Sequence, residues 1–160
     1  MNIIQEKWKE TKLFLSSGFV FENGDVFLFD IINLKLDEEC IATKKRKIGK
    51  FSIHWGDVFI QEKLQIPNCD NKIIVGSGGL GSDGFIVLVS NKNELIWSIF
   101  SESTNGFINI KYQENTVLVE SGSGYNYIIP LDEPLKLKRL KNRSPFNSNG
   151  ERTTYPPYLM

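Results

Sequence analysis

Short apolar runs separated by polar turns dominate the chain between residues 73 and 131. The runs are about four to eight residues long and rich in Val, Ile, Phe and Tyr, and the turns contain Gly, Ser, Asn and Asp. Around one turn the apolar side chains recur at every second position, with Ile108 and Ile110 before it and Val117 and Val119 after it. A period of two puts alternate side chains on a buried and a solvated face. This stretch therefore predicts antiparallel strands joined by hairpins.

Apolar runs nearer the N-terminus predict further strands. Asn23-Gly24 lies between two such runs and predicts a tight hairpin, because a type I′ turn needs positive φ at both central residues. Residues 50–66 predict another strand pair, which we expect to turn near Gly56-Asp57.

These patterns predict an all-β fold of about ten short strands in an antiparallel meander, arranged as a sandwich or a propeller-like stack of sheets. The strands expected in the meander cover residues 72–75, 84–90, 94–100, 106–112, 116–121 and 125–130. Residues 1–12 predict either a short helix or an irregular lead-in. The expected domain covers residues 1–140. Residues 141–160 are polar and rich in Ser, Asn and Pro, and they predict a partly disordered tail.

Charge is unevenly distributed along the chain although the formal total is zero. The net charge is −4 in residues 1–43, +4 in 44–63, −5 in 64–134 and +5 in 135–160. The bases concentrate in residues 44–50, which we expect to form a solvated turn, and near the C-terminus. An acidic β region disfavours nucleic acid and can steer a basic protein partner. The alternative interpretation, that these charges only solvate turns and strand edges, remains open.

Features of export and membrane insertion are missing from the sequence pattern. The basic N-terminus is not followed by an uninterrupted apolar stretch, and no window has the length of a transmembrane helix. Cys40 and Cys69 lie in different turn-like regions and are expected to be free thiols, although one disulfide is possible. These features predict a cytoplasmic protein.

Two sequence features resemble nucleotide-binding or metal-binding motifs but lack the residues or the secondary structure that such sites need. Residues 76–81 fit GxGxxG, but a strand rather than a helix follows, so we expect a hairpin loop and no nucleotide cofactor. His54 is the only histidine and lies in strand alternation, and with two scattered cysteines it makes a poor zinc site. We therefore predict no catalytic, cofactor-binding or metal-binding residue. Trp8, Trp55 and Trp97 leave glycan stacking open as an alternative.

Three short segments of the meander carry a family resemblance. They are Gly81-Ser82-Asp83-Gly84-Phe85, Leu95-Ile96-Trp97 and Ile128-Ile129-Pro130-Leu131-Asp132. They resemble small bacterial immunity proteins, the cytoplasmic antidotes of contact-dependent inhibition and other polymorphic toxin systems. The resemblance covers residues 75–134, about 60 of the 160 residues.

The resemblance implies an immunity protein that binds a cognate toxin and blocks its active site stoichiometrically, without catalysis. The acidic meander suits a basic toxin such as a nuclease, and neither nucleic acid nor membrane is an expected partner. The chain would be a monomer or a weak homodimer. The residues expected to contact the toxin are five loop acids and one aromatic anchor: Asp37, Glu38, Glu39, Asp83, Glu102 and Tyr125.

Two other classes of function remain open at the level of sequence. A carbohydrate-binding β-domain would show an ordered array of solvent-exposed aromatic side chains. A small hydrolase would show a concave pocket with a perturbed carboxylate or His54 at its floor.

Overall fold

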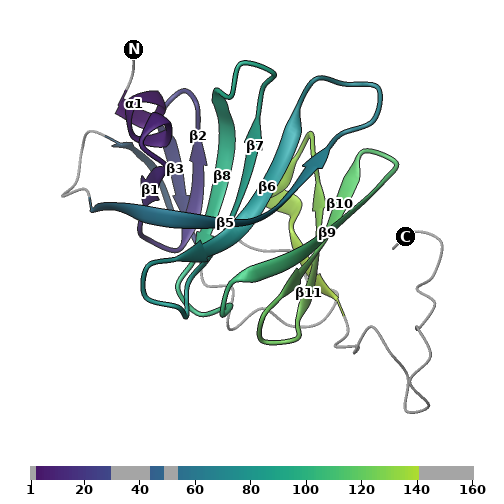
Figure 1. Ribbon diagram of the computed structural model, residues 1–160. Coiled ribbons are helices and arrows are strands. Elements are labelled where there is room, and N and C mark those ends of the chain that lie inside the picture. The colour runs from purple at the N-terminus through teal and green to yellow at the C-terminus, as the bar shows by residue number, and fades with distance from the viewer. Residues whose placement is uncertain (1–2, 30–43, 49–53, 141–160) are drawn as a thin grey trace.

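Two antiparallel β-sheets form the molecule (Figure 1). The structure is a computed structural model that describes residues 3–29, 44–48 and 54–140. These ranges contain twelve strands, the helix α1 (Ile3–Lys9) and the 3-10 helix η2 (Pro134–Lys136). The prediction of an all-β fold is confirmed, with twelve described strands where about ten were expected. The tail at 141–160 lies outside the described residues.

The meander crosses from one sheet to the other. The eight-stranded sheet contains, in spatial order, β1 (Lys12–Phe14), β5 (Trp55–Gln65), β6 (Lys72–Gly78), β7 (Gly84–Val89), β8 (Leu95–Ser101), β2 (Gly18–Phe21), β3 (Asp25–Leu28) and β4 (Lys44–Lys47). The four-stranded sheet contains β12 (Lys138–Leu140), β11 (Asn126–Pro130), β10 (Thr116–Ser121) and β9 (Phe107–Gln113). The crossing occurs between β8 and β9, so residues 102–106 join the sheets.

The central strands of the larger sheet, β7 and β8, are buried on both faces. One face packs against the smaller sheet, where Ile86 and Ile99 meet Val117 and Ile129 in one apolar cluster. The opposite face packs against a second cluster that draws on both edges of the sheet, on β1 and on Ile48 after β4, so the sheet curls around it. All six residues of β7 are therefore buried, which explains why its sequence is a continuous apolar run rather than an alternation.

Helix α1 closes the second cluster. Its buried residues, Ile4 and Trp8, lie one turn apart and belong to that cluster. Between them, Gln5 is bound to Leu95 at the start of β8: its Nε2 donates to the Leu95 carbonyl at 2.8 Å, and its Oε1 accepts from the Leu95 N–H at 2.8 Å. Of the two alternatives for residues 1–12, the short helix is therefore correct for Ile3–Lys9, whereas Lys12 already begins β1.

The hairpin at Asn23-Gly24 is confirmed, but its turn is not type I′. Only Gly24 has a positive φ, at 92°, and its N–H donates to the Phe21 carbonyl at 2.9 Å. Residues 22–24 therefore form a three-residue loop, in which a single left-handed residue at the last position is sufficient.

Two expected turns are strands. The turn predicted near Gly56-Asp57 is wrong, because β5 runs straight through both residues and pairs them with Leu13 and Lys12 of β1. The basic turn predicted within residues 44–50 is also wrong for Lys44–Lys47, which form β4 and pair with β3. In both cases the segment is extended because it pairs with a strand that is distant in the sequence. No helix within the described ranges is both long and apolar enough to cross a membrane.

Candidate functional site: an acidic and apolar end of the sandwich

Three loops meet where β6, β8 and β10 end. The Asn105 N–H donates to the Ser82 carbonyl at 2.8 Å, which joins the second loop to the first. The Gly122 N–H donates to the Gly106 carbonyl at 2.9 Å, which joins the third loop to the second. We call residues 78–84, 101–108 and 121–125, together with the neighbouring residues 54–60 at the start of β5, the three-loop end. Hydrogen bonds between loops hold it as one surface.

Glycine allows this close approach. A Cβ on Gly122 would overlap the Asn105 carbonyl oxygen, which is backbone and cannot rotate away. The third loop is further fixed by Ser121, which is 1% exposed. The Ser121 N–H donates to the Tyr125 carbonyl at 2.8 Å, and the Ser121 Oγ accepts from the Tyr125 N–H at 3.1 Å. The loop is preorganised by local bonds that a Ser-Gly-Ser-Gly sequence can supply.

Three of the six predicted contact residues, Asp83, Glu102 and Tyr125, lie at this end. Glu102 is exposed, and its N–H donates to the Ser17 Oγ at 3.1 Å. Tyr125 is half-buried, and the guanidinium of Arg139 lies 4.6 Å from its ring centroid. The other three predicted acids, Asp37, Glu38 and Glu39, lie outside the described residues.

Asp83 is not a surface acid. It is 4% exposed, its carboxylate lies against the backbone of Gly78, and the Ser82 hydroxyl lies 3.4 Å from its Oδ1. The turn chemistry predicted a loop acid correctly, but the loop folds this side chain inward. Its role at the three-loop end is therefore to support the loop, not to present charge to a partner.

Exposed apolar side chains at this end were missed by the sequence analysis. Leu80 is 84% exposed at the tip of the first loop, Phe59 is 58% exposed on β5, and Ile108 is 45% exposed at the start of β9. The Phe59 ring lies 4.0 Å from the position of a Cβ on Gly79, beside the loop. The exposure of Leu80 could have been predicted, because a single Leu in a glycine-rich loop has no neighbouring strand residues to pack against.

Ile108 was expected to share a face with Ile110. The register between β9 and β10 shifts here: Asn109 pairs with Glu120 while Phe107 pairs with Ser121, so Ile108 is an extra residue in a β-bulge. Because a bulge breaks the period of two, Ile108 is exposed while Ile110 is buried.

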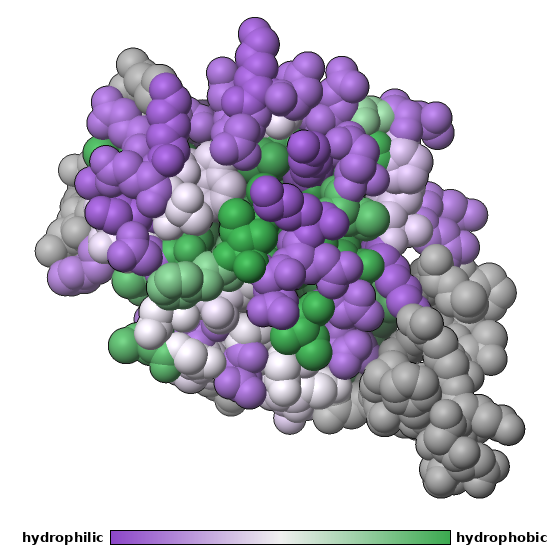
Figure 2. All heavy atoms as spheres, viewed as in Figure 1, coloured by the Kyte–Doolittle hydropathy of each residue, from purple (hydrophilic) through white to green (hydrophobic). Residues whose placement is uncertain are grey.

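Acids outnumber bases within this end, although two bases border it. Residues 54–60, 78–84, 101–108 and 121–125 contain three acids and no Lys or Arg, while Lys12 pairs with Asp57 across β1 and β5 and the Arg139 guanidinium lies 4.6 Å from the Tyr125 ring centroid. Two of these acids, Asp57 and Glu102, are exposed. On the face shown in Figure 2, hydrophilic residues gather in the upper part, whereas apolar and near-neutral residues occupy much of the lower left part. Exposed apolar side chains at the same end of a fold as exposed acids are compatible with a protein-binding site.

Behind this surface, Tyr127 is a neutral core residue. It is 2% exposed and packs edge-on against Phe107, with ring centroids 6.0 Å apart. Burial raises the pKa of the Tyr127 phenol to about 12, and the neighbouring positive charge of Arg139 opposes only part of that rise. Its hydroxyl therefore stays protonated at neutral pH and supplies no base.

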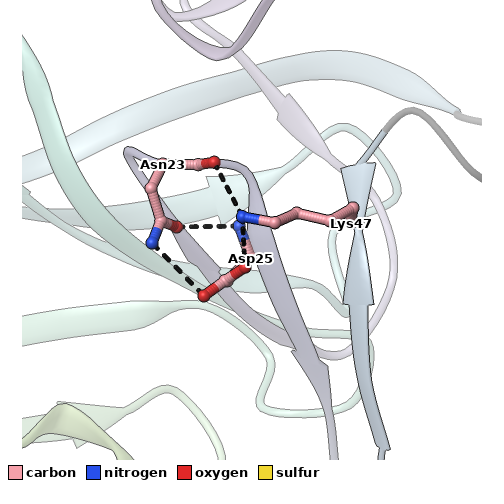
Figure 3. Close-up of polar contacts among 3 residues, drawn as sticks. All are labelled: Asn23, Asp25 and Lys47. Carbon is pink, nitrogen blue, oxygen red and sulfur yellow. Dashed lines mark hydrogen bonds and ion pairs between the residues drawn. The ribbon is translucent and has the colours of Figure 1, made fainter.

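The polar cluster in Figure 3 holds strands together. Lys47 Nζ lies 2.6 Å from Asp25 Oδ1 and donates to the Asn23 carbonyl at 3.2 Å. Asn23 Oδ1 accepts from the Asp25 N–H at 2.9 Å. These bonds attach β4 to the turn between β2 and β3, so the cluster has a structural role.

Two crevices lie at the opposite end of the strands. The larger, of about 750 Å³, lies between α1 and the turns after β2 and β7, and its lining residues are all polar or charged. The smaller, of about 360 Å³, lies between the turn after β5 and the loops of the smaller sheet. In the smaller crevice Asn115 and Asp132 are bonded to each other, with Nδ2 donating to Oδ2 at 2.6 Å. Neither crevice contains a histidine.

Metal ligands, a nucleophile in a pocket and exposed tryptophans would favour an enzyme or a carbohydrate-binding domain, and the structure shows where each of these side chains lies. Within the described ranges no three His, Cys, Asp or Glu side chains gather to hold a metal ion. His54 is exposed ahead of β5, and Cys69 is an exposed free thiol. Trp8 and Trp97 are buried and Trp55 is half-buried, so the tryptophans form no exposed array for sugar rings.

Comparisons of the chain with protein-family models, with curated proteins and with solved structures found no match.

Proposed function

We propose that this chain is an immunity protein that binds a cognate toxin through the three-loop end and blocks it stoichiometrically. The toxin is a basic domain, such as a nuclease, and the complex forms in the cytoplasm. The chain performs no catalysis; it inhibits by covering the toxin's active site or substrate groove.

One observation carries this proposal: exposed apolar side chains and exposed acids share a preorganised end of the sandwich. Burial of Leu80, which is 84% exposed, would stabilise a complex by about 1.5 to 3 kcal/mol, and Phe59 and Ile108, which are 58% and 45% exposed, would each contribute about half as much. Asp57 and Glu102 add negative charge, which accelerates association with a basic protein. Because the loops are already hydrogen-bonded to each other, little conformational entropy is lost on binding.

The alternatives receive less support. A carbohydrate-binding domain needs exposed aromatic platforms, and Trp8 and Trp97 are buried instead. A small hydrolase needs a catalytic group in a concave site, and the two crevices described above, at the far end of the strands, do not include His54. The exposed aromatic at the three-loop end, Phe59, lies beside the aliphatic Leu80 loop, which suits a protein surface better than a sugar.

The test is a pull-down with the tagged protein from cells that express the protein encoded immediately upstream. We expect a stoichiometric complex with a basic, otherwise toxic domain, retained at about 50 mM salt and weakened at about 500 mM. If no partner is recovered at either salt concentration and the upstream product is harmless, the proposed function is wrong.

A further inference from the structure

Most of the outer edge of β5 is without a strand partner among the described residues. β1 pairs with Trp55, Gly56 and Asp57, and the last bond on this edge runs from the Val58 N–H to the Thr11 carbonyl at 3.1 Å. Beyond this point, β5 continues to Gln65 and pairs only with β6 on its inner edge. An unpaired strand edge can pair with another chain, and here the bulge at Gln61 and the charged side chains of Glu62 and Lys63 restrict which strand can add.

Two fixed points show which backbone groups face outward. At one end the Val58 N–H points to β1, and at the other the Ile66 N–H donates to the Asn71 carbonyl at 3.0 Å, toward β6. Alternation along an antiparallel ladder then directs the N–H and C=O of Lys63 and Gln65 outward. The register shift between Ile60 and Glu62 makes Gln61 an extra residue, so Ile60 also faces outward.

The side chains beside this edge favour an added strand. Phe59 pairs with Ser77 and Ile60 with Gly76, so these two residues lie on opposite faces of the sheet. They are 58% and 43% exposed, and an added strand would cover both. Glu62 is half-buried on the same face as Phe59, and no ion pair is seen for it among the described residues. A basic side chain on the incoming strand would complement it.

The edge is continuous with the three-loop end, because Phe59 belongs to both. We propose that the toxin docks by adding one of its own strands to the outer edge of β5, with apolar side chains against Phe59 and Ile60 and a basic side chain near Glu62. This inference rests on the proposed function and specifies how the partner is held: main-chain hydrogen bonds supply affinity, and the flanking side chains supply selectivity.

The direct test is hydrogen exchange of the full chain by NMR, free and in complex with the upstream-encoded toxin domain. We expect the amides of Ile60, Lys63 and Gln65 to exchange rapidly in the free protein and to be protected at least about tenfold in the complex. The amide of Ile66, bonded to Asn71, serves as the internal reference and should be protected in both states.

A matched pair of variants separates the contribution of the main-chain N–H to toxin binding from that of the side chain. Lys63→Pro removes an outward N–H, and Lys63→Ala removes the side chain but keeps that N–H. We expect Lys63→Pro to weaken toxin binding at least about tenfold and Lys63→Ala to change it less than about threefold. The melting temperature of each variant shows whether the fold is intact, and the exchange experiment does not depend on either variant.

The outcomes distinguish the two proposals. If the toxin binds while these three amides remain unprotected, the strand-addition inference is wrong and the proposed function stands. If the amides are protected in the free protein in a concentration-dependent way, a second copy of this chain occupies the edge, which overturns the inference. If no toxin binds, both proposals fail.

Discussion

At the scale of single residues, the path of the backbone determines where a loop side chain points, and residue type alone does not. The sequence predicts that the Gly-Ser-rich segments are loops, because these residues favour turns. It does not predict that Asp83 points inward, because that depends on how the loop folds its carboxylate back against Gly78 at the end of β6. Local composition therefore identified the loop, and the three-dimensional path of the loop determined the orientation of its carboxylate.

Gly122 tests the close approach of the second and third loops. Replacing Gly122 with Ala places a Cβ against the Asn105 carbonyl oxygen, so we expect the free energy of unfolding to fall by about 1 to 3 kcal/mol. Urea denaturation measures this change. Gly79→Ala is the control, because its Cβ would meet only contacts at 4.0 Å, and we expect a change within about 0.5 kcal/mol. Equal effects of the two substitutions would contradict the close packing of the loops.

Tyr127 gives stability a pH dependence in the alkaline range. Burial raises its pKa from 10.0 in the unfolded chain to about 12 in the fold. The neutral phenol's contribution is therefore complete below pH 10 and is lost as the pH rises from about 10 to about 12, by about 2 to 3 kcal/mol in total. Urea denaturation of the wild type and Tyr127→Phe across this range measures it. The variant should lack this part of the decline, and identical pH profiles would refute the assignment.

At the scale of elements, the alternation of apolar and polar residues predicted most strands. It failed for two segments with turn-like composition, because pairing with another strand keeps them extended. The continuous apolar run at 84–89 was recognisable as a strand whatever its neighbours. Gly56-Asp57 resembles a turn, yet pairing with β1 keeps both residues in β5. Lys44–Lys47 has the composition of a solvated turn, yet it forms β4, with Lys47 opposite Asp25 in register.

The Asp25–Lys47 ion pair tests how firmly β4 is attached. Asp25 is 12% exposed, so Lys47→Met removes a cation from a largely buried carboxylate, and we expect a loss of about 1 to 3 kcal/mol in the free energy of unfolding. The control is Lys12→Met, which breaks the exposed pair with Glu10 at 3.4 Å and should change the free energy of unfolding by less than about 0.5 kcal/mol. Urea denaturation compares the two variants, and a Lys47→Met effect as small as the control would contradict this assignment.

At the scale of the whole molecule, the functional surface is a product of topology. Its members come from β5, from the loop after β6 and from the crossing between the two sheets. No local pattern links Phe59, Leu80 and Ile108, because their grouping depends on where the chain leaves one sheet for the other. The sequence predicted sheets and loops, but it did not predict which loops share an end or that apolar side chains gather there.

The most direct test of the proposed toxin surface is isothermal titration of the purified, catalytically inactivated toxin domain into the wild type, Leu80→Asp and Ile3→Asp. Leu80 lies at the three-loop end, and Ile3 is an exposed apolar residue of α1 outside it. We predict a tight one-to-one complex for the wild type, binding weakened at least about 30-fold in Leu80→Asp, and wild-type affinity in Ile3→Asp. Wild-type affinity in Leu80→Asp, or the absence of a one-to-one complex, would contradict the account.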